Sequence, residues 1–252
     1  AGLAAVEAAV LATWDYRELK TKGEESAPRA ALDTVTILAH GDKELAEIGH
    51  AVHHGTITAR GANIARDLQQ SPGNVATPTF IAERAREIAE RLEMKITVLD
   101  RAQIRKEGMH ALIGVAQGTQ EEPRFVAMEY RGGGKDEKPL VLIGKGVTFD
   151  SGGISIKPSD RMGDMKYDMS GAAAVIGAMH AIAELGLKVN VVAPTPHTEN
   201  LPSGTAIKPG DVLRTHLGRT IEIVNSDAEG RLILADALCF ARRYEPAAIV
   251  DC

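Results

Sequence analysis

Several features that would narrow the function are scarce in this sequence. Its 252 residues include only two cysteines, Cys239 and Cys252, which form neither a disulfide framework nor a metal-binding spacing. We therefore expect a reducing, cytoplasmic environment. Acidic residues outnumber basic ones, and the net charge of −5 argues against a nucleic-acid or anionic-membrane surface. No apolar run reaches the roughly 20 residues that a membrane-spanning helix requires.

The remaining composition, 44% apolar and 25% charged, is that of an ordinary globular chain. Apolar residues at helical spacing predict helices over 1–19, 43–68, 79–92, 170–184 and 231–243, the second interrupted by Gly55 and Gly61. Apolar or β-branched runs predict strands over 34–38, 95–99, 124–130, 140–143, 188–193, 220–224 and 247–250. This alternation predicts an α/β fold with a mixed, mostly parallel sheet flanked by helices on both faces.

Some segments carry weaker signals. No signal peptide is visible, although the chain starts at Ala1 rather than Met. The last strand has no helix after it, which we interpret as truncation. Residues 194–209 contain four prolines and are expected to form a loop. His197 in this segment and His216 beyond it are expected to be loop residues near the surface. His50, His53 and His54 have a metal-compatible helical spacing, but no carboxylate or cysteine motif accompanies them, so we interpret them as part of a partly exposed helix face.

Two polar loops carry the chemistry. Gly144-Lys-Gly-Val-Thr-Phe-Asp-Ser-Gly-Gly153 follows a predicted strand, and Asn225-Ser-Asp-Ala-Glu-Gly-Arg231 follows another. The two loops contain three carboxylates, Asp150, Asp227 and Glu229, and Asp168 adds a fourth. Like charges gathered at strand ends cost stability unless cations neutralise them. A pair of divalent ions held roughly 3.5–4 Å apart is a natural remedy, and such a pair can activate a water.

The chemistry of the ligands leaves the identity of the metal open. Neither loop contains histidine or cysteine, so an oxygen-rich site for zinc, manganese or magnesium is expected. Lys145 could ligate only as the neutral amine. Two other interpretations are a salt-bridge network at strand ends and a phosphate loop at Gly144-Lys-Gly146, although the latter lacks the longer phosphate-loop spacing.

Three motifs resemble the leucine aminopeptidase (cytosol aminopeptidase) family. They are the loop from Gly144 to Gly153, Met165-Lys-Tyr-Asp168, and Asn225-Ser-Asp-Ala-Glu-Gly-Arg-Leu232. The likeness extends to Ala65-Arg-Asp-Leu68 and to Glu199-Asn-Leu-Pro-Ser-Gly-x-Ala-x-Lys-Pro-Gly-Asp211. It implies that residues 1–42 are the tail of an N-terminal α/β domain, 43–65 a connecting helix, and 66–252 a catalytic domain without its C-terminal third.

The resemblance also implies a role for each metal ligand. Asp150 and Glu229 would bridge two divalent ions, zinc or manganese with magnesium possible. Lys145 and Asp168 would complete the tighter site, and Asp227 the more exchangeable one. A water bridging the two ions would attack the peptide, whose free α-amino group would bind a metal.

Other residues would act on the substrate. By resemblance, Lys157 would polarise the scissile carbonyl, and Arg231 would hold a bicarbonate ion that serves as general base. Met165 and Asn225 are expected to contact the substrate, although core packing explains Met165 as well. Differences from the family pattern, such as Ser226 where Thr is common, spare every expected ligand.

The expected function is hydrolysis of the N-terminal residue of peptides, with leucine and other apolar residues preferred. The family is hexameric and cytoplasmic, so we expect the full-length protein to be a homohexamer, without membrane association and without a nucleic-acid partner. An alternative is a truncated, inactive family member that serves as a structural, assembly or nucleic-acid-binding module. A two-metal phosphatase is a third hypothesis.

Overall fold

The computed structural model describes residues 2–21 and 34–252. Its centre is a six-stranded mixed sheet in the order β1 (Lys95–Leu99), β2 (Arg124–Arg131), β5 (Asn190–Asn200), β3 (Leu140–Ile143) and β8 (Ala248–Asp251), with β4 (Gly146–Asp150) also paired to β5. The pairs β1–β2 and β2–β5 are antiparallel, whereas β3 and β4 pair with β5, and β3 with β8, in parallel. The expected α/β class with a mixed sheet is confirmed.

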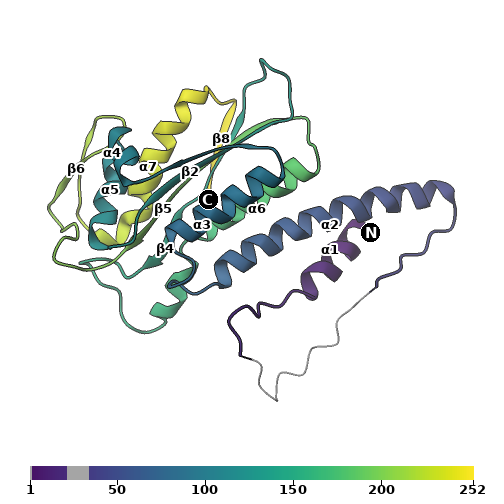
Figure 1. Cartoon of the computed structure of the whole chain (residues 1–252), viewed down its shortest axis with the longest axis horizontal. Coiled ribbons are helices and arrows are strands. Elements are labelled where there is room, and N and C mark those ends of the chain that lie inside the picture. The colour runs from purple at the N-terminus through teal and green to yellow at the C-terminus, as the bar shows by residue number, and fades with distance from the viewer. Residues whose placement is uncertain (1, 22–33) are drawn as a thin grey trace.

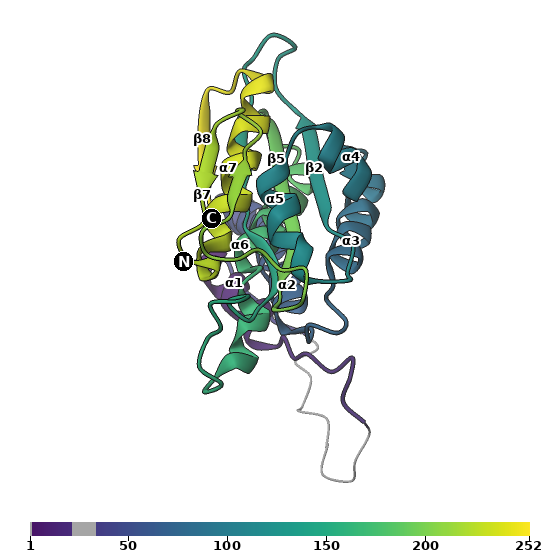
Figure 2. The same cartoon turned by 90° about the vertical axis from the view of Figure 1, so that its left-hand side faces the viewer.

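Helices cover both faces of this sheet (Figures 1 and 2). One face carries α3 (Pro78–Arg91) and α6 (Ser170–Glu184), and the other carries α4 (Arg101–Lys106), α5 (His110–Val115) and α7 (Glu229–Ala241). Side chains alternate along β2 between these layers. Phe125 and Ala127 belong to the core beneath α5 and α7, whereas Val126 and Met128 belong to the core beneath α3 and α6.

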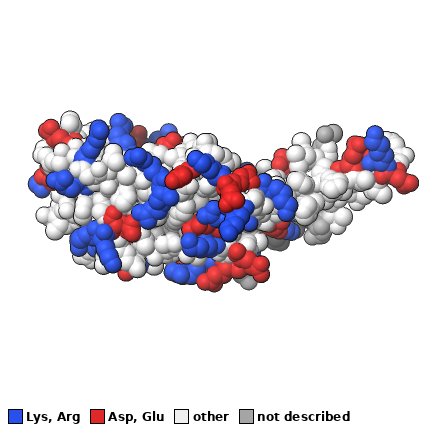
Figure 3. Space-filling view, turned by 90° about the horizontal axis from the view of Figure 1, so that it is seen from above, with Lys and Arg blue, Asp and Glu red and all other residues white. Residues whose placement is uncertain are grey.

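The longest helix extends beyond the sheet. α2 (Asp42–Gln70) packs against α6 near the body and against α1 (Gly2–Ala12) further out (Figure 1). The helix is continuous, so the predicted interruption at Gly55 and Gly61 is wrong. Both glycines instead allow neighbouring helices to pack closely. A Cβ at Gly61 would lie 2.6 Å from the Gly177 oxygen on α6, and one at Gly55 would lie 3.1 Å from the Leu3 oxygen on α1. From above, Lys and Arg are interspersed with Asp and Glu, so this face has no extended basic surface (Figure 3).

Several predicted elements need correction. Residues 34–38 form no strand; Val35 and Leu38 are 50% and 81% exposed, and no neighbouring strand pairs with them in the described part of the chain. The first helix ends at Ala12 instead of residue 19. β4, α4 and α5 were not predicted, and the segment expected to be a loop from 194 continues β5 to Asn200.

The remaining elements are short. The short turns are η1 (Ala116–Gly118), η2 (Met162–Tyr167), η3 (Ser226–Ala228) and η4 (Arg242–Tyr244). A small separate hairpin joins β6 (Val212–Arg214) to β7 (Thr220–Glu222). Within the ranges 2–21 and 34–252, no helix is both long enough and apolar enough to cross a membrane.

Candidate metal centre

The site begins at an interruption between two strands. β3 pairs with Val191 and Val192 of β5, and β4 resumes the pairing at His197, so Gly144 and Lys145 lie in the gap. The Lys145 backbone is nonetheless fixed, because its N–H donates to the Cys252 oxygen at 2.8 Å and its carbonyl accepts from Ala172 at 2.8 Å. A Cβ on Gly144 would lie 2.6 Å from Ala172 Cα. The glycine therefore lets the gap approach the start of α6, with the lysine at the carboxyl end of β3.

Each of two lysines joins a pair of carboxylates. Lys145 Nζ lies 2.7 Å from Asp168 Oδ1 and 2.8 Å from Glu229 Oε1. Lys157 Nζ lies 2.8 Å from Asp150 Oδ2 and also contacts Asp227 Oδ1. The structure thus brings the six expected polar residues into one network. Since four carboxylates face two ammonium groups, the network has an excess of negative charge.

Burial sharpens this imbalance. Asp150 and Glu229 are 2% and 1% exposed. Burial raises the pKa of Asp168 to about 6; the hydrogen bond from Lys145 offsets part of the effect, and the nearby charges of Glu229 and Asp150 add to it. Burial disfavours the charged form of Lys145, but hydrogen bonds to Asp168 and Glu229 outweigh burial and raise the pKa of this lysine. The carboxylates repel one another, and nearby cations are needed to offset this repulsion.

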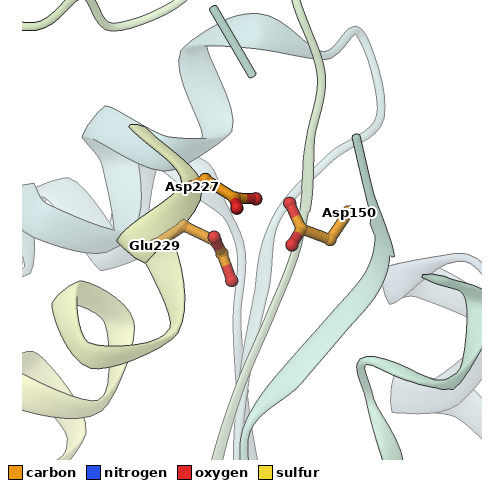
Figure 4. Close-up of side chains that lie close together, drawn as sticks. All are labelled: Asp150, Asp227 and Glu229. Atoms are coloured by element: carbon orange, nitrogen blue, oxygen red, sulfur yellow. The ribbon is translucent and has the colours of Figure 1, made fainter. Parts of the chain in front are cut away.

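Three of the carboxylates converge closely enough to share an ion. Oxygens of Asp150, Asp227 and Glu229 all lie within 4.8 Å of one another. Figure 4 shows the side chains pointing together, Asp150 from the end of β4 and the other two from the segment that opens α7. Asp168 Oδ2 is buried, and it has no hydrogen-bond partner among the described residues. An oxygen-rich, partly unsatisfied donor set of this kind fits hard or borderline divalent ions.

The backbone also leaves space for the end of the Lys145 side chain. A Cβ on Gly230 would lie 2.7 Å from both Cε and Nζ of Lys145, so only glycine leaves room for the lysine tip in this position. Gly152 has a φ of +88°, and a Cβ there would lie 3.0 Å from Asp227 Oδ1. Glycine at these two positions lets the backbone approach the polar cluster.

Two residues to which the sequence motifs assigned no role, Ser226 and Asn200, hold the two loops together. Ser226 Oγ donates to the Gly152 oxygen at 2.7 Å and accepts from Ser155 N at 2.8 Å. Asn200 Nδ2 donates to Asp150 Oδ1 at 2.8 Å and to the Ser226 oxygen at 3.0 Å. Asn200 lies in one of the family-like motifs, which was the only available signal, since a single asparagine has no distinctive spacing.

Three expected residues lie at the edge of the network. Arg231 is exposed on the first turn of α7, and no hydrogen bond or ion pair joins it to another described residue. Lys157, Met162 and Met165 line the same open surface pocket. Asn225 is exposed, and its side chain accepts from the Asp227 N–H at 2.8 Å, which fixes the turn that presents Asp227.

The expectation that His197 lies near the surface is wrong. It is fully buried on β5, and burial lowers its pKa to about 3. His216 does lie in a turn, but it is half-buried, and its Nδ1 is 2.7 Å from the Glu107 oxygen. In the described part of the chain, no histidine joins the cluster that could hold an ion.

Comparison with known proteins gives this geometry a context. Residues 63–252 match the sequence profile described as "Cytosol aminopeptidase family, catalytic domain". The chain belongs to the cytosol aminopeptidase family. It is 50% identical to a probable cytosol aminopeptidase of Syntrophotalea carbinolica over 98% of this chain and 49% of the relative. Another, from Geobacter sulfurreducens, is 57% identical over 75% of this chain and 38% of the relative.

Solved structures share the same fold. The bottromycin maturation enzyme BotP superposes with a TM-score of 0.86 and 36% identity, covering 99% of this chain and 51% of BotP. BotP in complex with Mn gives 0.84 and 37% identity, covering 98% of this chain and 50% of BotP. The chain thus spans about half the length of these relatives.

Proposed function

We propose that this chain carries the metal centre of an aminopeptidase that removes N-terminal residues, leucine and other apolar residues preferred. The observation that carries the proposal is the convergence of Asp150, Asp227 and Glu229 within 4.8 Å in a chain of the cytosol aminopeptidase family. The buried, unpartnered Asp168 Oδ2 supports an additional ligand position beside them. Mn in a BotP structure supports manganese as one candidate, with zinc as another.

The proposed ligand roles follow the resemblance. Asp150 and Glu229, the most deeply buried of the four carboxylates in the site, would bridge two divalent ions. Lys145 and Asp168 would complete one site and Asp227 the other. Such ions, when bound, supply an activated water and stabilise negative charge on the reacting carbonyl. Because a lysine ligates only as the neutral amine, binding through Lys145 would release a proton, and the affinity would rise with pH.

The remaining roles belong to the chain's own cations. Lys157 would lie against the scissile carbonyl and stabilise the charge that develops on its oxygen. Its position beside Met165 in the open surface pocket supports contact with substrate. Arg231, exposed and unpaired within the described residues, would hold bicarbonate as the general base. Asn225 would hold the Asp227 turn beside the substrate.

The whole protein would act on peptides with a free N-terminus. By family resemblance we propose that it is a homohexamer. We also propose that it acts in the cytoplasm, which the relatives' name, cytosol aminopeptidase, supports. A second candidate is a catalytically inactive structural or assembly module. The ion pairs of Lys145 and Lys157 with the carboxylates of the site are compatible with such a structural role.

The decisive experiment measures hydrolysis of leucyl p-nitroanilide with added Mn²⁺ or Zn²⁺, for this chain and for a longer protein of the relatives' full length. Turnover that is lost in Lys157→Ala while Mn²⁺ still binds would support the aminopeptidase. Absence of turnover in both proteins at saturating metal would refute it. Hydrolysis of a phosphoester that survives Lys157→Ala would instead favour a two-metal phosphatase.

A further inference from the structure

Asn200 has a position in the carboxylate network that the ligand roles do not explain. Its side chain is buried, and Nδ2 donates to Asp150 Oδ1 at 2.8 Å and to the Ser226 carbonyl at 3.0 Å. The same nitrogen lies 3.3 Å from Glu229 Oε2. A primary amide has two N–H donors, and here both are directed at one small region. The two carboxylates with the proposed bridging role therefore share one amide donor.

The surrounding backbone holds this amide in place. Asn200 ends β5 in register with Asp150 at the end of β4. Its carbonyl accepts from the Ser151 N–H at 3.0 Å and from Ser151 Oγ at 2.7 Å. On the other side, Gly153 has a φ of +67°, and a Cβ there would lie 2.7 Å from Asn200 Oδ1. The amide is thus packed between a glycine turn and the carboxylates, so it cannot rotate without displacing the loop.

The chemistry of an amide suits this position. Lys145 and Lys157 also contact these carboxylates, but while each lysine is protonated its positive charge opposes the approach of a cation. Asn200 orients the same carboxylates with neutral donors, which leave their negative charge available. Partners that hydrogen-bond to metal-ligating carboxylates fix the geometry of the ligands and tune metal affinity.

We propose that Asn200 is a positioning residue that holds Asp150 and Glu229 in the orientation required to bind divalent cations. The proposal rests on the function proposed above, because it assigns a role toward the same metal centre. It predicts that removing the amide weakens metal binding because the N–H donors are lost, and not because side-chain volume is lost.

The test is a calorimetric titration of the 252-residue chain with Mn²⁺, which does not depend on catalytic turnover. Asn200→Ala removes the donors and volume, whereas Asn200→Leu removes the donors and retains most of the volume. Asn190 is the matched control, since it lies buried at the opposite end of β5 and donates to the Gly134 and Glu137 oxygens. We expect both Asn200 variants to bind Mn²⁺ about 10–100-fold more weakly than the wild type. Asn190→Ala should remain within about twofold even if it unfolds more readily.

The outcomes separate this inference from the proposed function. A wild-type chain that binds no Mn²⁺ overturns both. Wild-type binding with unchanged affinity in Asn200→Ala, or in Asn200→Leu alone, overturns only the role of the Asn200 donors. If neither variant folds, a crystal structure of the Mn²⁺-loaded wild type decides. Asn200 Nδ2 hydrogen-bonded to Asp150 or Glu229 supports the proposal, and a side chain turned away from both refutes it.

Discussion

Replacing Gly230 with alanine tests whether the backbone reserves space for the lysine at the metal centre. The new Cβ would lie 2.7 Å from both Cε and Nζ of Lys145 and 2.9 Å from Cδ. Those atoms form the flexible end of a side chain, so the fold can accommodate the methyl group if Lys145 moves. Movement would break at least one of the two contacts of Lys145 Nζ, which are 2.7 Å to Asp168 and 2.8 Å to Glu229.

The size of the effect follows from two opposing contributions. Losing one charge-assisted hydrogen bond costs about 1.5–3 kcal/mol. Alanine in place of glycine in α7 recovers up to about 1 kcal/mol through its helix propensity. We therefore expect Gly230→Ala to lower the free energy of unfolding by about 0.5–3 kcal/mol. Displacing a proposed ligand should also weaken Mn²⁺ binding by at least about tenfold, or 1.4 kcal/mol.

Urea unfolding and Mn²⁺ titration measure the two effects separately. Gly49→Ala is the matched control, because Gly49 lies within α2 and a Cβ there meets no atom within 4 Å. It should stabilise the chain by about 0.5–1 kcal/mol and leave Mn²⁺ affinity unchanged. Unaltered Mn²⁺ affinity in Gly230→Ala would refute the role of Lys145 at the metal centre.

Three further predictions concern the fold and the site. Gly61→Ala places a Cβ 2.6 Å from the Gly177 backbone oxygen, so α2 and α6 must separate; urea unfolding should show a loss of about 1–3 kcal/mol, and equal stability would contradict the close packing. Burial lowers the pKa of His197 to about 3, below its usual value near 6.5, so its contribution to stability is complete above pH 6.5 and is lost as the pH falls toward 3. Between pH 6 and 4.5, the unfolding free energy of the wild type should therefore fall by about 1.4 kcal/mol more per pH unit than that of His197→Gln. If the unfolding free energies of the two proteins changed in parallel with pH, neutral His197 would make no such contribution. In the longer protein, Lys157→Ala should lower kcat by about 100–1,000-fold. Mn²⁺ should bind this variant at least as tightly, because a cation that competes for Asp150 is removed; weaker binding in titration would contradict the assignment.

The sequence was informative where local pattern and tertiary environment agree. The runs at 124–130 and 140–143 are apolar and β-branched, and they form β2 and β3 within one residue of the expected bounds. The helices at 79–92 and 170–184 were also anticipated, because their apolar periodicity matches the faces that they bury. The carboxylates and lysines of the site were identified as a set because their motifs are unusually ordered.

The features that the sequence did not predict depend on pairing between strands that are far apart in the chain. Pro194 and Pro196 lack N–H donors and suggested a loop, yet they lie inside β5. They fall opposite the gap between β3 and β4, where the parallel ladder is already interrupted. β4 contains Val147, Thr148 and Phe149, which favour strands, but this short run lies within a glycine-rich segment that was interpreted as a loop, and its pairing with β5 could not be read from the sequence. For the same reason, the burial of His197 and the contacts of Asn200 could not be anticipated.

The most direct test of the central claim is the number of metal ions bound at the carboxylate cluster. Purified chain would be saturated with Mn²⁺, and anomalous scattering would locate and count the ions in its crystals. We predict two ions among Asp150, Asp168, Asp227 and Glu229, with Lys145 beside one of them. The Asp150→Asn, Glu229→Gln double variant should contain none. An empty cluster in the saturated wild type, or ions retained in the double variant, would contradict the account.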